Sequence, residues 1–89
     1  MLTDYHKRRI EHREARIEKL REEVIELLKY VKSGMRRYGK MKPNVHDVFA
    51  SESLLMQIKL ARQEVTELRK QIKRLEREID REYKVGKTP

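Results

Sequence analysis

Several residue types are rare or missing in this 89-residue chain, which has no cysteine or tryptophan, one phenylalanine, two prolines and three glycines. Without cysteine, the chain has neither a disulfide nor a thiolate metal site. A chain this short buries little surface by itself, and aromatic residues make up only 6% of it. The composition therefore favours a narrow apolar seam with solvated flanks over a compact mixed core, and association with a second copy is a common remedy.

Long apolar runs are also missing. The longest apolar runs have three residues, as in Leu54-Leu55-Met56, whereas a helix that spans a membrane needs about 20 apolar residues. Residues 1–9 are polar and basic, unlike a signal peptide. We therefore expect an intracellular, cytoplasmic protein that makes no contact with a membrane.

The chain does contain two runs of apolar residues that alternate at spacings of three and four. The first run consists of Ile10, Ile17, Leu20, Val24, Leu27, Val31 and Tyr38. The second run consists of Leu54, Ile58, Ala61, Val65, Leu68, Ile72, Leu75 and Ile79. Such spacing marks the a and d positions of a coiled coil. The pattern predicts an all-α fold with two long helices.

The breakers between the two runs set the expected boundaries of a single domain over residues 1–89. We predict a first helix over about 3–38, with Gly39 as a left-handed cap residue, and a basic turn over about 39–46 that contains Pro43. The second helix is expected over about 47–84, followed by a frayed tail over 85–89.

Antiparallel pairing of the two runs makes every layer of the seam apolar and predicts a helical hairpin, that is, a two-helix coiled coil. The predicted layers are Val31 with Leu54, Leu27 with Ile58, Val24 with Ala61, Leu20 with Val65, Ile17 with Leu68 and Ile10 with Leu75. This register centres the turn within residues 39–46. The register one heptad further along puts Gly34 opposite Ile58 and Ile10 opposite Glu82, so we expect it to be less favourable.

A parallel arrangement is the alternative to the hairpin. β-Branched residues at a with leucine at d favour parallel dimers, so each helix could instead pair with its copy in a second chain. Pro43, which follows Gly34 and Gly39, argues against one continuous rod.

Near the turn, the apolar stripe is wider than a two-helix seam can cover. The additional apolar residues are Leu28, Met35, Val48, Phe49, Leu55 and Met56. A stripe of this width normally packs against more than one neighbour. We predict that two hairpins form a homodimer here, as a four-helix bundle. The alternative occupant is a different protein.

Positive charge is in excess, with 23 Lys and Arg against 15 Asp and Glu and a formal net charge of +8. Two clusters of basic residues are candidate contacts for nucleic acid or a nucleoprotein complex. The first lies in and before the turn, at Arg36, Arg37, Lys40 and Lys42, and the second follows one face of the second helix, at Lys70, Arg74, Arg77 and Arg81. Either cluster could equally be a solvated surface.

Catalytic chemistry has no support in the sequence. His6, His12 and His46 lack the spacing of metal ligands, and the carboxylates belong to a solvated coil with no cleft to shift their pKa values. We expect no enzyme activity, cofactor, metal or small-molecule substrate. The predicted function is a non-catalytic module that docks on nucleic acid. The alternatives are a protein–protein adaptor or inhibitor, such as a small phage or mobile-element regulator, and a structural coiled coil.

Residues 17–27 resemble the first helix of the small helical-hairpin aspartyl-phosphate phosphatases of sporulation control. Ser51-Glu52-Ser53-Leu54-Leu55 is similar to the Ser-Gln-Glu-Leu-Asp signature of that family. Leu55 stands where the family has its acidic residue. The resemblance therefore implies no phosphatase activity, and the chain is not assigned to the family.

Overall fold

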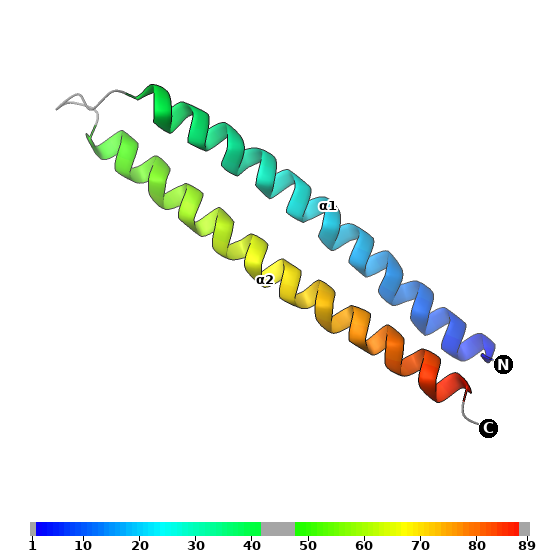
Figure 1. The fold of residues 1–89 in the computed structure, drawn as a ribbon. Coiled ribbons are helices and arrows are strands. Elements are labelled where there is room, and N and C mark those ends of the chain that lie inside the picture. The colour runs from blue at the N-terminus through cyan, green and yellow to red at the C-terminus, as the bar shows by residue number, and fades with distance from the viewer. Residues whose placement is uncertain (1, 42–47, 88–89) are drawn as a thin grey trace.

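The computed structural model describes residues 2–41 and 48–87, with the backbone alone at Val48 and Lys87. Two helices, α1 (Asp4–Lys40) and α2 (Val48–Lys87), lie side by side and run in opposite directions (Figure 1). They form a rod of 70 × 14 × 13 Å. The predicted all-α helical hairpin is confirmed.

Local hydrogen bonds define both ends of α1. Thr3 is the N-cap, and its Oγ1 accepts a hydrogen bond from the His6 backbone N–H at 3.4 Å. Asp4 follows in the first turn, where a negative charge interacts favourably with the helix dipole. At the other end, the Met41 N–H donates to the carbonyls of Arg37 and Tyr38. The predicted start of this helix at residue 3 is therefore within one residue of the observed start.

Both helices continue past their predicted C-terminal ends near residues 38 and 84, to Lys40 and Lys87. Gly39 and Lys40 are helical, and no described residue has a positive φ, so Gly39 is not a left-handed cap. The helix ends instead at Met41, which has an extended backbone. Residues 85–87 belong to α2 and not to a frayed tail, and Gly86 packs close to the side chains of Leu2 and His6 at the start of the chain. The predicted turn residues 42–46 and tail residues 88–89 lie outside the described residues.

The core is a single seam of a and d residues between the helices. The buried apolar side chains are Ile10, Ile17, Leu20, Val24, Val31, Leu54, Ile58, Ala61, Val65, Leu68 and Ile72. Leu20 and Ile58 are the most deeply buried, each with 1% of its surface exposed. Each large apolar side chain buried in this way contributes about 1.5–3 kcal/mol. All of these residues belong to the two predicted runs, but Tyr38 of the first run is 40% exposed, and Leu27, Leu75 and Ile79 are only partly buried.

The observed register differs from the predicted one by one heptad. Gly34 lies against Ile58, and a Cβ added to Gly34 would be 3.0 Å from the Ile58 Cγ1 atom. Val31 shares a buried cluster with Ala61. At the other end, Glu82 is buried and contacts His6. The predicted layers, such as Leu27 with Ile58, are therefore wrong.

The polar residues of the seam explain the difference. Arg13 occupies a d position, and in the predicted register it would have faced Ile72 with no carboxylate opposite. In the observed register its guanidinium reaches Glu78 at 3.2 Å and Glu82 at 3.1 Å. A charged group at an apolar seam is costly unless it is paired. At the turn end, the absence of a side chain at Gly34 leaves room for Ile58.

Two helical glycines provide a matched test of the observed register. We expect Gly39→Ala to stabilise the hairpin by about 0.5–1 kcal/mol, because it restores helix propensity and nothing lies within 4 Å of the new Cβ. Gly34→Ala gains the same propensity but crowds Ile58, and overpacking costs about 1–3 kcal/mol. Urea unfolding followed by circular dichroism should therefore show Gly34→Ala to be the less stable variant. Equal stabilisation by both substitutions would contradict the contact between Gly34 and Ile58.

Candidate nucleic-acid interface

The second predicted basic cluster lies along the outer face of α2. Its members, Lys70, Arg74, Arg77 and Arg81, are all exposed, and their spacings of four, three and four place them on the side away from the seam. Lys70 forms an ion pair with Glu67 at 3.3 Å. Within the described part of the chain, the other three have no ion-pair partner. Their guanidinium groups are therefore available to an anion.

α1 adds an arginine to this face that the sequence analysis missed. Arg16 and Arg74 line the same shallow groove between the helices, together with Gln71 and Leu75, and the groove has a volume of about 250 Å³. We call Arg16, Lys70, Arg74, Arg77 and Arg81 the terminal basic surface. Arg16 occupies the g position of the heptad, which borders the seam. It could have been assigned to this face once the correct register was known.

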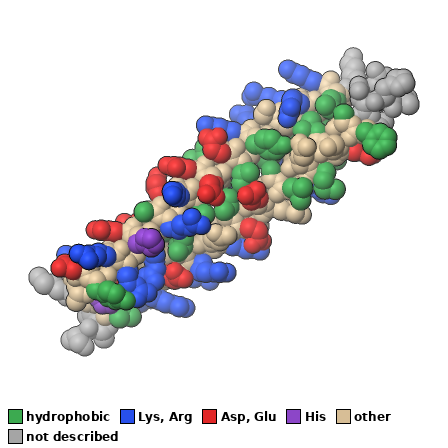
Figure 2. Space-filling view, turned by 180° about the vertical axis from the view of Figure 1, so that it is seen from behind, with side chains coloured by type: hydrophobic (Ala, Val, Ile, Leu, Met, Phe, Trp, Pro, Cys, Tyr) green, Lys and Arg blue, Asp and Glu red, His purple; other side chains and the backbone are tan. Residues whose placement is uncertain are grey.

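Folding brings positive charge from both helices together in the terminal half. Residues 4–20 and 69–86 lie alongside each other and contain thirteen Lys and Arg against eight Asp and Glu. Toward the turn, residues 21–35 of α1 contain three of each and residues 53–68 of α2 contain two of each, and Arg36 and Arg37 follow next on α1. On the face in Figure 2, hydrophobic side chains gather in the half nearest the turn, and charged side chains predominate in the other half. The terminal half thus has the larger excess, five positive charges in 35 residues, whereas the densest excess, three in 14 residues, stays at residues 34–47 around the break.

The first predicted basic cluster lies at the other end of the hairpin. Arg36, Arg37 and Lys40 are exposed in the last turns of α1, and Lys42 lies outside the described residues. Because Gly34 contacts Ile58, Arg36 lies two residues nearer the turn than Ile58, and Lys70, the nearest residue of the second cluster, is roughly 20 Å away along the rod. The structure therefore does not bring the two predicted clusters into one site.

A polar cluster closes the seam in the terminal half, and the sequence analysis did not predict it. The His6 Nδ1 lies 2.5 Å from the Glu82 Oε1. The Arg13 Nη1 donates to the Glu82 Oε2 at 3.1 Å, and Arg9 is 3.6 Å from the same oxygen. The available signal was the presence of His6, Arg13 and Glu82 at d positions, where apolar residues are usual.

This cluster lowers the pKa of Glu82 below its ordinary value of 4.5. The largest cause is the hydrogen bond with His6, and the hydrogen bond with Arg13 and the charges of Arg9 and His6 act in the same direction. Burial of Glu82 works against them by disfavouring the charged form. The ionised carboxylate is therefore the form that stabilises the folded hairpin.

The predicted apolar interface is exposed in the single chain. The exposed fractions are 41% for Leu28, 47% for Met35, 88% for Phe49, 43% for Leu55 and 57% for Met56. The Val48 side chain lies outside the described residues. Ile25, which is 52% exposed, borders the same side of the hairpin. We call Ile25, Leu28, Met35, Phe49, Leu55 and Met56 the turn-end patch.

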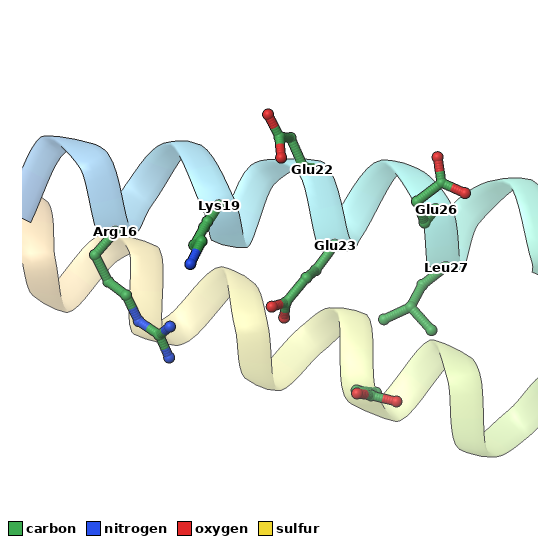
Figure 3. A pocket seen from close by; sticks show the side chains of 7 residues that line it. Arg16, Lys19, Glu22, Glu23, Glu26 and Leu27 are labelled. Carbon is green, nitrogen blue, oxygen red and sulfur yellow. The ribbon is translucent and has the colours of Figure 1, made fainter.

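Another groove lies halfway along the hairpin and has a volume of about 600 Å³. It is lined by Arg16, Lys19, Glu22, Glu23, Glu26, Leu27 and Glu64. Figure 3 shows Arg16, Lys19, Glu23 and Leu27 pointing toward α2, while Glu22 and Glu26 point away from it. The four glutamates make this groove a poor site for an anion. Among the described residues, no group of three or more His, Asp or Glu could hold a metal ion.

Comparisons with protein-family models, curated proteins and solved structures gave no match. Neither helix, over its described residues, has a stretch that is long and apolar enough to cross a membrane.

The lowered pKa of Glu82 predicts how stability depends on pH. A carboxyl group whose pKa is lower in the folded state contributes stability above its unfolded pKa of about 4.5 and loses that contribution as the pH falls through the folded value. We expect Glu82→Gln to be less stable than the wild type at pH 7, with a difference that shrinks below about pH 4.5. Urea unfolding between pH 2.5 and pH 7 measures this difference.

Glu67→Gln is the control for this measurement, because it also removes one carboxylate from an ion pair on α2. The Glu67–Lys70 pair is exposed, at 66% for each side chain, and such pairs contribute little. Glu67→Gln should therefore retain the stability and the pH dependence of the wild type. If Glu82→Gln behaved like Glu67→Gln, the polar cluster would have no role in stability.

Proposed function

We propose that the protein is a non-catalytic binding module that docks on nucleic acid through its terminal basic surface. The observation that carries this proposal is the convergence of exposed basic residues from both helices on the terminal half, where Lys and Arg exceed Asp and Glu by five. Arg74, Arg77 and Arg81 are exposed there without an ion-pair partner among the described residues, and Arg16 faces the same groove as Arg74. Anionic phosphates are the chemistry that this surface fits.

The geometry favours contacts with the phosphate backbone over contacts with bases. From Lys70 to Arg81, the stripe extends about 16 Å along a straight helix, which is several phosphate spacings of a duplex. Arginine binds phosphate through paired N–H donors. Contacts of this kind position a protein but carry no sequence information directly. We therefore expect strong dependence on salt and little sequence specificity.

The turn-end patch supports two further proposals. We propose that a second copy covers it, so that a homodimer forms a four-helix bundle in the turn half. Apolar residues at a, d and e, as in this half, are the pattern of a helix that packs against more than one neighbour. The second candidate function is a protein–protein adaptor or inhibitor, in which a host protein would cover the same patch. The exposure of Phe49, at 88%, favours an occupant of either kind.

Two charge-reversal variants test the proposed docking surface. The first combines Arg74→Glu, Arg77→Glu and Arg81→Glu, and the second combines Arg36→Glu, Arg37→Glu and Lys40→Glu. Both variants change the net charge by the same amount, so a difference in their affinities shows that the location of the substituted residues matters. We expect the first variant to bind a short DNA or RNA duplex more than about tenfold more weakly. The negative slope of log affinity against log salt concentration should become shallower by about 2.7, because three phosphate contacts are lost.

The second variant should bind the duplex much more tightly than the first. Fluorescence anisotropy at several salt concentrations measures both properties, and circular dichroism checks that each variant folds. Equal losses in the two variants would show that only the total charge matters. Absence of duplex binding by the wild type at low salt would remove the proposal.

A further inference from the structure

The turn-end patch and the terminal basic surface occupy opposite ends of the hairpin, and this separation restricts how two copies can associate. The turn-end patch lies on one side of the hairpin, since Leu28, Met35 and Leu55 all occupy e positions and Met35 is bridged to Arg62 of α2 by a 3.3 Å hydrogen bond. Farther toward the termini, charged residues follow on the same side, where Arg21 and Glu76 form an ion pair at 3.3 Å. The side available for packing is therefore confined to the turn half.

The size of the patch matches the requirement of a stable dimer. Six residues that are 41% to 88% exposed, with about 200 Å² each when fully exposed, present on the order of 600 Å² of surface. Two copies would together bury roughly 1,200 Å², the lower limit of standard interfaces. A second copy therefore buries enough surface for a stable interface, and the same contact covers its own exposed patch.

Charge decides between the two arrangements that cover both patches. If the turns lay at the same end, the two terminal halves, each with an excess of five positive charges, would run alongside each other. Neighbouring helices are about 10 Å apart, comparable to the screening length of about 8 Å in physiological salt, so the repulsion would be felt. If the turn halves overlap head to head, the terminal halves point away from each other and this repulsion is avoided.

We infer that the protein bridges nucleic acid: two copies join through their turn-end patches with the turn halves overlapping, and their terminal basic surfaces project from opposite ends. This inference rests on the proposed docking of the terminal basic surface on nucleic acid. Each end of the dimer binds one duplex segment, so one dimer holds two segments together. The charged e positions near Arg21 and Glu76 stay in solvent, where their ion pair is already satisfied.

Small-angle X-ray scattering of the wild-type protein tests the arrangement without nucleic acid. One hairpin is 70 Å long. Two hairpins that overlap by about 35 Å give a dimer with a maximum dimension of roughly 105 Å, from a rise of 1.5 Å per residue over the turn halves. A dimer close to 70 Å long would have its hairpins side by side and would overturn the inference. A monomer would also overturn it and would leave the patch to a different protein.

A capture experiment tests the bridging activity. A DNA duplex fixed to beads should retain a second, fluorescent duplex only when the protein is present. Leu55→Glu places a charge in the patch, and we expect it to give a monomer that binds a single duplex within about twofold of the wild type. Its capture of the second duplex should fall by at least about tenfold, because bivalency is lost.

Leu60→Glu is the matched control. Leu60 is 55% exposed, comparable to Leu55, but it lines a groove with Tyr30, Gln57 and Glu64 and lies outside the patch. This variant should remain dimeric and should retain bridging. Bridging by Leu55→Glu at the wild-type level would overturn the inference. If the wild type binds no duplex, the proposed function and bridging both fail, while scattering still reports whether the turn halves overlap.

Discussion

A charged side chain beside an apolar seam must have a partner of opposite charge, and the hairpin meets this requirement in the observed register. Arg13 lies at a d position of α1, and its carboxylate partners Glu78 and Glu82 lie on α2. The predicted register offered a continuous set of apolar layers but would have left this guanidinium facing Ile72. The heptad repeat makes several registers geometrically acceptable, and pairing of the buried charge selects among them.

The choice of register determines which surfaces lie together. With Gly34 against Ile58, residues 4–20 of α1 lie alongside residues 69–86 of α2, and their basic side chains form one charged half. The turn half then contains the exposed apolar residues, on a side that carries no comparable excess of charge. A single chain thus has two ends with different chemistry, and the proposed binding to nucleic acid and to a second copy each use one of them.

Much of the fold could be predicted from periodicity alone. The heptad spacing identified both helices, and every buried apolar residue belongs to the predicted a and d runs, although Tyr38 of the first run is 40% exposed. The register could not be predicted by comparing layers one at a time. The favourable interaction that selects it is made jointly by a set of polar groups that includes His6, Arg13 and Glu82. Each of them looks unfavourable alone. Gly39 was misjudged because glycine favours a left-handed cap only when the chain turns at that residue, and here the helix continues.

The candidate site was predicted less completely than the fold. The α2 stripe could be found because spacings of three and four place residues on one helix face, and Leu28, Met35 and Leu55 could be recognised as more than a two-helix seam requires. The contribution of Arg16 could not be predicted from the sequence, because it depends on which residue of α2 lies opposite. The separation of the two basic clusters likewise follows from the length of the rod, which a list of charged residues does not show.

The polar cluster around Glu82 also limits sliding of the two helices. Slippage by one heptad would displace α2 by about 10 Å relative to α1 and would still match apolar residues with apolar residues over most of the seam. It would also remove Glu82 from His6 and Arg13 and would take Ile58 out of the space beside Gly34. These two contacts, one near each end of the rod, therefore hold two helices of repetitive sequence in a single alignment.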